Sequence, residues 1–224
     1  YNFKINGSLS DSIEREIFLT GFYDKDRFDY LNKFIRNYNF EYFFDIGSYI
    51  GFYSLYFSHF IKIPNVISFE PNEINFKRLK NNIVLNNSNI ISHNIACSNF
   101  NGNGEVWFND INKTGGSSII NPKDKEILKY NSSKIIYRPI RLKTLDSMYE
   151  KMFNKNILIK IDVERYEINV LEGSSKILKN NNVLMQIEAM PEQKKIVFEF
   201  LYNYNFYHIS SIDNDHFFTN FIKL

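Results

Sequence analysis

An acidic residue followed by two spaced glycines is the first pattern in this chain with chemical potential. The apolar run Tyr42–Ile46 carries Asp45, and Gly47 and Gly51 follow it with three residues between them. Glycine lets a backbone turn sharply and approach a ligand without a Cβ in the way. A helix beginning near Phe52 would direct its free N–H groups toward the same place. The pattern indicates a turn, between a strand and a helix, that can hold a nucleotide-like ligand.

A second acid stands at the end of the next apolar run. Glu70 follows Val66–Phe69, at roughly the 20-residue spacing typical of an acid that binds a ribose. A carboxylate at a strand end can accept hydrogen bonds from both ribose hydroxyls. The alternative is that Glu70 is a solvated residue before Pro71. The neighbouring Asp45 motif favours the ribose interpretation.

The glycine spacing excludes two common phosphate sites. A P-loop needs a Lys-Ser/Thr pair after its glycines, and this stretch has none. The dinucleotide fingerprint is also absent, because Tyr49 occupies the position of its second glycine. A bulky residue there suits a ligand that has a nucleoside but no pyrophosphate.

Composition sets wide limits on the protein. The chain has 224 residues, a net charge of +2 and 44% hydrophobic residues, which suits one domain with a real core. The near balance of charge gives no indication of nucleic-acid binding. The single cysteine, Cys97, allows no disulfide within the chain and favours a cytoplasmic location. No apolar stretch approaches the ~18 residues of a membrane span. The chain begins at Tyr1 and not at Met, so we expect a trimmed protein or a piece of a longer one.

Other catalytic classes lack their motifs here. The four histidines are scattered, and the chain contains no HExxH or C-x-x-C pattern, which argues against zinc. There is no G-x-S-x-G elbow of an α/β-hydrolase. We expect Cys97 to be a small buried residue and not a nucleophile.

The elements that must position these acids alternate along the chain. Short apolar runs with no polar face alternate with amphipathic segments, which predicts an α/β fold with a mostly parallel sheet covered by helices on both faces. Residues 11–40 have helical periodicity, so we expect an N-terminal helical segment over 1–40 and the sheet over 41–224, within one domain. The predicted strands are Tyr42–Ile46, Val66–Phe69, Ile90–Ile95, Ile157–Ile161 and Val183–Ile187, and the predicted helices are Tyr53–Ile61, Phe76–Asn86 and Glu167–Lys179.

Two regions break this alternation. Glu105–Phe108 and Ile135–Leu142 resemble strands around a polar segment, Asn109–Ser133, which we expect to cover the active site with Ser117 and Ser118 facing the substrate. At the end of the chain, Phe206–Ile212 and Phe217–Lys223 suit an antiparallel pair, and the sheet would then have a reversed last strand.

Taken together, the motifs resemble those of the FkbM family, a class I Rossmann-like group of S-adenosylmethionine-dependent methyltransferases. The resemblance covers roughly residues 40–191 in the right order. It rests on "DIGSYIGFYS" (45–54), "FEPNEINFKRLKNNIVLN" (69–86), "HNIACSN" (93–99), "GGSSI" (115–119), "IRLKTLDS" (140–147), "IKIDVERYEINVLEGS" (159–174) and "LMQIEAMP" (184–191).

The resemblance implies a cofactor, S-adenosylmethionine, with S-adenosylhomocysteine as product. It implies O-methyl transfer to a hydroxyl of a sugar, a glycan or a similar small molecule. Asp45 would either reach the methionine amino group through water or cap the loop without contacting a ligand, and Asn94 would either contact adenine or satisfy turn backbone. The implied cofactor-binding residues are Asp45, Gly47, Tyr49, Gly51, Ser54, Glu70, Pro71, Asn72, Asn94, Ala96 and Asp162.

Three acids are the candidate catalytic residues. Asp162 or Glu164 is the expected base, because a hydroxyl is a poor nucleophile until its proton leaves. The equal alternative is that Asp162 only binds the cofactor's amino group. Glu188, at the end of the next strand, would position the substrate or a base. Asp162 and Glu188 could also ligate Mg²⁺, which is the minority interpretation since a third clear ligand is missing.

Two positions depart from the family pattern. Arg165 stands where the family usually has glycine, which implies an ordinary backbone there or a changed pocket on the substrate side. Tyr49 stands where the family often has Asn. Two other functions stay open at this point, a nicotinamide-dependent oxidoreductase and a catalytically silent cofactor-binding domain of a larger protein. The acceptor, its methylated position and the oligomeric state do not follow from these residues.

Overall fold

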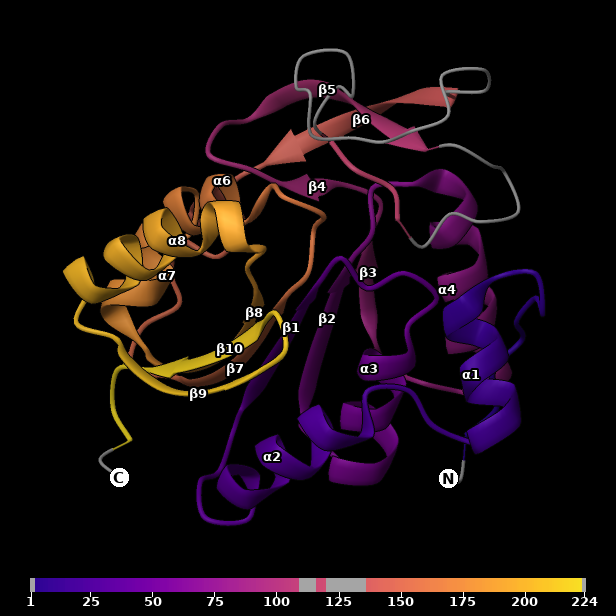
Figure 1. Cartoon of the computed structure of the whole chain (residues 1–224), viewed down its shortest axis with the longest axis horizontal. Helices are drawn as coiled ribbons and strands as arrows, with labels where there is room; N and C mark the ends of the chain where they lie inside the picture. The colour runs from indigo at the N-terminus through magenta and orange to yellow at the C-terminus, as the bar shows by residue number, and fades with distance from the viewer. Residues whose placement is uncertain (1–2, 109–115, 120–135, 223–224) are drawn as a thin grey trace.

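The computed structural model describes residues 3–108, 116–119 and 136–222. Its centre is a seven-stranded sheet with the strand order β3-β2-β1-β7-β8-β10-β9 (Figure 1). The strands of this sheet are β1 (Tyr42–Ile46), β2 (Asn65–Phe69), β3 (Ile91–His93), β7 (Asn156–Ile161), β8 (Asn182–Glu188), β9 (Tyr207–Ile212) and β10 (Asp215–Thr219).

The predicted parallel sheet with a reversed last strand is confirmed. Strands β3, β2, β1, β7 and β8 pair in parallel, and β10 pairs antiparallel with both β8 and β9. The strand that is last in the sequence therefore lies inside the sheet, and β9 forms the edge. The carboxyl ends of β1, β2, β7 and β8 meet at one edge of the sheet, where ligands bind in open α/β sheets.

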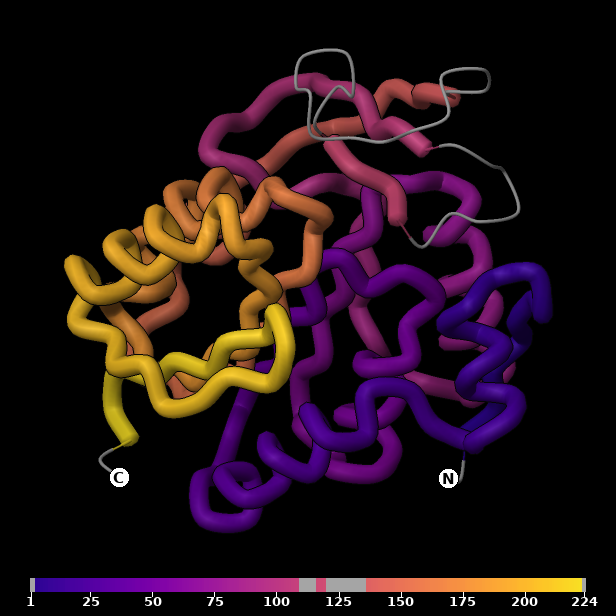
Figure 2. Tube along the Cα trace, in the orientation of Figure 1, coloured from indigo at the N-terminus to yellow at the C-terminus, as the bar shows by residue number. Residues whose placement is uncertain are grey.

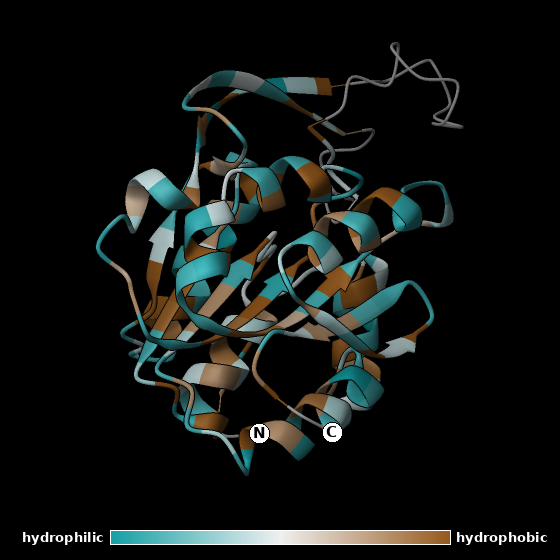
Figure 3. Ribbon diagram, turned by 90° about the vertical axis from the view of Figure 1, so that its left-hand side faces the viewer, coloured by the Kyte–Doolittle hydropathy of each residue, from teal (hydrophilic) through white to brown (hydrophobic). Residues whose placement is uncertain are grey.

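Helices cover both faces of the sheet (Figure 3). On one face, Phe28, Phe57 and Leu79 are buried against Phe43 and Leu158 of the strands. The helices near this face are α1 (Ser12–Thr20), α2 (Lys25–Ile35), α3 (Phe52–Leu55), its continuation as a π-helix over Tyr56–Ile61, and α4 (Glu73–Leu85).

The second face has its own core. Val170, Leu178 and Leu201 are buried against Ile159 and Ile187. These helices are α5 (Leu145–Met148), α6 (Glu167–Glu172), α7 (Ser175–Asn180) and α8 (Pro191–Asn203). Since both cores share the strands of one sheet, and since α2 packs directly on it, we propose that residues 1–40 belong to the same domain as the rest of the chain.

The observed helices differ from the prediction in three places. The predicted helix Glu167–Lys179 is two helices, because a Cβ on Gly173 would lie 1.8 Å from the carbonyl oxygen of Ser98 and the chain breaks there to allow this approach. The helical segment 11–40 is also two helices, separated after Gly21, whose φ of 77° ends α1. The helix α8 has no counterpart among the predicted elements.

A small second sheet lies beyond the carboxyl edge of the first (Figure 1). It pairs β6 (Ile136–Lys143) with β4 (Ala96–Cys97) and β5 (Gly102–Phe108). Two of these strands were predicted, and β5 begins before its predicted start. Most of the segment expected to cover the site, Asn109–Ser133, lies outside the described residues. None of the described helices has the length and apolar character of a membrane span.

Candidate active site

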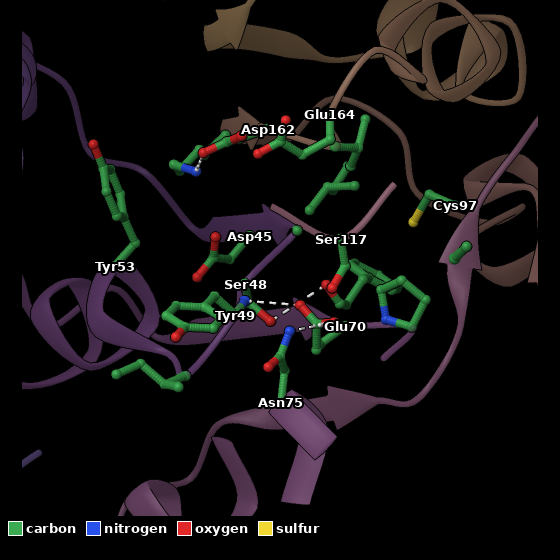
Figure 4. A pocket seen from close by; sticks show the side chains of 18 of the residues that line it. Asp45, Ser48, Tyr49, Tyr53, Glu70, Asn75, Cys97, Ser117, Asp162 and Glu164 are labelled. Carbon is green, nitrogen blue, oxygen red and sulfur yellow. Dashed lines mark hydrogen bonds and ion pairs between the residues drawn. The ribbon is translucent and has the colours of Figure 1, made fainter. Parts of the chain in front are cut away.

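A pocket opens at the carboxyl edge of the large sheet (Figure 4). It collects side chains from the ends of four strands, from the loop after β1 and from the N-terminal helical segment. Asp45, Gly47, Tyr49, Glu70, Pro71, Ala96, Ser117, Asp162, Glu164 and Glu188 are the predicted site residues that line it.

Glu70 is held at the end of β2 by backbone amides. Its Oε2 accepts a hydrogen bond of 2.9 Å from the Tyr49 N–H, and its Oε1 accepts one of 2.8 Å from the Asn72 N–H. The side chain is 5% exposed, and burial raises its pKa to about 8 despite these bonds. Oε1 also accepts a longer hydrogen bond of 3.4 Å from the Asn75 amide, so Oε2 keeps the free lone pair that can accept a ribose hydroxyl.

Asp45 lies beneath the loop after β1 and carries a free acceptor. The Ser54 hydroxyl donates to its Oδ2, and Oδ1 has no hydrogen-bond partner among the described residues. Burial raises the pKa of this carboxyl, and the nearby charge of Lys160 opposes the shift. An acceptor this deeply buried costs free energy unless a donor reaches it, directly or through water.

The loop between β1 and α3 needs its glycine at the turn. Gly47 has a φ of 83°, and a Cβ there would lie 1.8 Å from the carbonyl oxygen of Asp162. The N–H groups of Gly47 and Ser48 both donate to the Phe69 carbonyl, each at 3.0 Å. These contacts lock the turn across the carboxyl ends of β1, β2 and β7, so that the first glycine of the motif is required by backbone contact.

The acids of β7 and β8 face the other half of the pocket. Asp162 pairs with the ammonium group of Lys160 at 2.7 Å, whereas Glu164 and Glu188 line the pocket beyond it. Burial, and then the negative charge of Asp162, raise the pKa of Glu164 to about 7 and that of Glu188 to about 8. Carboxyls with pKa values in this range suit a general base that works near neutral pH.

No described group of three or more His, Cys, Asp or Glu side chains has the arrangement of a metal site. Asp162 and Glu188 line the same pocket, but no third ligand joins them among the residues described. The Mg²⁺ interpretation therefore gains no support from the geometry.

Several predicted site residues support the pocket from behind and do not line it. Asn94 donates to the carbonyls of Glu70 and Pro71 at 2.8 and 3.0 Å, so its amide satisfies turn backbone. Asn72 caps α4 and donates to the Ser117 hydroxyl at 2.9 Å. The others in this group are Gly51, where a Cβ would meet Leu79, Ser54, which also bonds Ser68, and Ser118, which donates to the Glu164 carbonyl.

Arg165 does not have the ordinary backbone that its side chain implies. Its φ is 77°, in the left-handed region that glycine adopts most easily, and Glu164 before it has a φ of 52°. The guanidinium pairs with Glu192 at 2.8 Å, and Gln193 donates to the Arg165 carbonyl at 2.7 Å. The loop therefore keeps the glycine-like conformation, and contacts with the first turn of α8 offset its strain. The Arg165 side chain does not line the pocket.

Among the lining residues that the sequence prediction missed, three are informative. Lys160 points inward from β7 within an apolar run, and its position two residues before Asp162 is a signal that could have identified it. Tyr23, between α1 and α2, lines the pocket, and its pKa is raised by burial and then by Asp24 and Asp162. Ile13 comes from α1. Nothing in the local sequence of these last two residues marks them, because their position depends on the tertiary fold.

The polar groups of the pocket suit the expected cofactor. S-adenosylmethionine offers an ammonium group and two ribose hydroxyls as donors, and the free Oδ1 of Asp45 and the carboxylate of Glu70 are buried acceptors on the same side of the pocket. The apolar side chains of Phe69, Ile95 and Ala96 also line it and suit an adenine ring. The donor and acceptor chemistry of these residues thus fits the cofactor.

Comparisons with solved structures support the fold. The METTL16 MTase domain matches with a TM-score of 0.53 and 10% identity, covering 98% of this chain and 73% of that chain. The human methyltransferase 10 domain containing protein matches with a TM-score of 0.52 and 10% identity, covering 98% of this chain and 87% of that chain. At such low identity the likeness shows the class I methyltransferase fold alone.

A family comparison is more specific. A search of curated proteins gave no match. The model of the methyltransferase FkbM domain matches residues 45–212, which is more than half of the chain and contains every acid of the pocket named above. The chain therefore belongs to the FkbM family of S-adenosylmethionine-dependent methyltransferases.

Proposed function

We propose that the protein transfers a methyl group from S-adenosylmethionine to a hydroxyl of a sugar, a glycan or a similar small molecule. One observation carries the proposal of O-methyl transfer. Glu164 and Glu188 face the same pocket as Asp45 and Glu70, and burial brings their pKa values to about 7 and about 8. The preference for a glycan comes from the family resemblance.

One half of the pocket binds the cofactor and the other half binds the acceptor. Asp45 and Glu70 hold the cofactor by its ammonium group and its ribose, and S-adenosylmethionine supplies the electrophilic methyl group when bound. The loop between Gly47 and Gly51 positions this half, because its Tyr49 N–H holds the Glu70 carboxylate. Positioning of this kind provides much of the rate in a displacement reaction.

Glu164 and Glu188 are the candidate bases in the acceptor half. An acceptor hydroxyl reacts faster when a carboxylate takes its proton, and a base whose pKa lies near the working pH does this best. Asp162 is less suited, because its carboxylate is already engaged by the Lys160 ammonium group at 2.7 Å. We therefore assign Asp162 to binding, with its charge held by Lys160, and the proton to Glu188 or Glu164.

The proposal is tested by incubating the protein with S-adenosylmethionine and a panel of hydroxylated acceptors. A second panel of acceptors with amino groups serves as control. Mass spectrometry should find one added methyl on a hydroxylated acceptor. Glu188→Gln or Glu164→Gln should lose most of this turnover but keep affinity for S-adenosylhomocysteine, whereas the exposed Glu150→Gln should behave as wild type.

Two results would reject the proposal. Methylation of amines or of RNA, and of no hydroxylated small molecule, would assign another acceptor. Cofactor binding with no transfer to any acceptor would favour a catalytically silent domain. A cytoplasmic location is a separate prediction, which fractionation of the producing cells would test.

A further inference from the structure

The deepest carboxylate of the N-terminal segment belongs to Glu14 of α1. Its residue is 3% exposed, although helix α1 as a whole lies at the surface. It precedes the family-matched segment, which begins at residue 45. The tube in Figure 2 shows this N-terminal segment beside α4, next to the loop after β1. A buried carboxylate is costly unless donors surround it, so its partners indicate what it holds together.

Glu14 has three donors from three parts of the chain. The Tyr49 hydroxyl donates to its Oε1, and the Arg78 guanidinium of α4 and the backbone N–H of Ser8 donate to its Oε2. The backbone at Gly7 packs closely on this carboxylate, since a Cβ on Gly7 would lie 2.7 Å from Oε2 of Glu14. The carboxylate thus joins α1, α4 and the loop after β1 at one point.

Tyr49 carries this connection into the pocket. Its hydroxyl donates to Glu14, and its backbone N–H donates to Glu70 at 2.9 Å. Its φ is 50°, a conformation that an aromatic residue adopts only when its surroundings impose it. The Arg78 guanidinium lies 5.9 Å from the centre of the Tyr49 ring and completes the support. Ile13, the residue before Glu14, lines the pocket itself.

From these contacts we propose that Glu14 is a positioning residue for the cofactor site. It fixes the Tyr49 side chain, and through it the strained backbone whose N–H orients the Glu70 carboxylate toward the ribose. Helix α1 then contributes to cofactor binding and is a working part of the methyltransferase domain. This inference rests on the cofactor half of the proposed function and is independent of the acceptor.

The proposal has a thermodynamic consequence. If α1 must be docked for Glu70 to be well placed, then cofactor binding must in turn favour docked α1, because coupling between two sites is reciprocal. Binding of S-adenosylhomocysteine should therefore slow amide hydrogen exchange in α1, although Glu14 does not line the pocket. A purely structural ion pair would not produce this response.

The test is calorimetric titration of S-adenosylhomocysteine into wild-type protein and three variants. Tyr49→Phe removes the hydroxyl that reaches Glu14 and keeps the ring near Arg78, so its affinity should fall about tenfold, the effect expected of one oriented hydrogen bond. Glu14→Ala should lose at least as much, and Glu14→Gln, which keeps an acceptor for Tyr49, should recover part of the loss. Glu16→Gln on the exposed side of α1 is the control and should bind as wild type.

Hydrogen exchange supplies the second readout. In wild type, S-adenosylhomocysteine should slow amide exchange in residues 12–20, and in Tyr49→Phe this protection should disappear. Wild-type affinity in Tyr49→Phe would overturn the proposal, and so would weaker binding with protection of α1 unchanged. If wild type itself bound no S-adenosylhomocysteine, the cofactor site and this inference would both fall, whereas a failed acceptor screen would affect the proposed reaction alone.

Discussion

The Lys160 ammonium group lies 2.7 Å from the Asp162 carboxylate at the end of β7. Lys160 is 5% exposed and also lies 4.8 Å from the centre of the Tyr53 ring. Its charge favours the ionised form of Asp45 and so opposes the effect of burial on the pKa of that carboxyl. The buried cation thus holds together the two halves of an acidic pocket.

Replacing this cation should destabilise the protein. Lys160→Met keeps an unbranched side chain that is one atom shorter, and it leaves the carboxylates of Asp45 and Asp162 without their counter-charge. Removal of one partner from a buried pair costs about 3–5 kcal/mol, and the partial exposure of Asp162 lowers our expectation to about 2 kcal/mol. Urea unfolding measures the change, and Lys195→Met, at a side chain that is 87% exposed, serves as control. Equal stability of the two variants would show that Lys160 is not an electrostatic support.

The left-handed backbone at Arg165 predicts an order of stability. Arg165→Gly and Arg165→Ala both lose the ion pair with Glu192. The φ of 77° at this position is unfavourable for alanine but not for glycine. The glycine variant should therefore be more stable than the alanine variant by about 1 kcal/mol. Thermal or urea unfolding of the two proteins measures this difference. The reverse order would mean that the loop does not keep this conformation in solution.

The fold was predictable from the sequence to the extent that it depends on local patterns. The mostly apolar runs ending at Ile46, Phe69 and Ile161 predicted strands with correct carboxyl ends, and these ends place Asp45 and Glu70. The break of the predicted helix at Gly173 was not predictable, because it results from the approach of Ser98, a residue distant in sequence.

The same distinction applies to the site. Asp162, Glu164 and Glu188 were identified because each follows a strand, and all three line the pocket. Tyr23 was missed because it enters from the N-terminal segment, whose docking depends on tertiary contacts. The conformation of Arg165 was mispredicted because side-chain identity is a weak guide where neighbours such as Glu192 compensate for strain.

Raised carboxyl pKa values predict how stability depends on pH. The pKa of Glu188 rises from 4.5 to about 8 on folding, so the folded protein holds more protons than the unfolded chain between these values. Stability must then fall as pH rises through this window. The pKa of His216 is lowered from 6.5 to about 4, so this group makes stability rise with pH, but only below about pH 6.5. The fall in stability that Glu188 causes should therefore be clearest between about pH 6.5 and 8.

The melting temperature of the ligand-free protein, measured from pH 6.5 to 8, tests this slope. In Glu188→Gln the fall should be shallower, because the glutamine does not titrate. Glu150→Gln, at an exposed position, should keep the wild-type slope. Identical slopes in wild type and Glu188→Gln would show that Glu188 ionises normally.

Asn94 allows a choice between two roles. The structure uses its amide to satisfy the carbonyls of Glu70 and Pro71. Asn94→Ala should therefore lower the free energy of unfolding by about 1–2 kcal/mol, since two carbonyls lose a donor. It should weaken the binding of S-adenosylhomocysteine only a few-fold. Unfolding and titration of one preparation measure both effects. A large loss of affinity at unchanged stability would instead indicate a direct contact with adenine.

The most direct test of the whole account is titration of S-adenosylhomocysteine into wild type and Glu70→Ala. Wild type should bind it with micromolar affinity and should not bind NAD. Loss of the buried ribose acceptor should weaken binding by roughly 1–3 kcal/mol, or about tenfold to a hundredfold. Absence of binding to wild type, or an unchanged affinity in Glu70→Ala, would contradict the placement of the cofactor between Asp45 and Glu70.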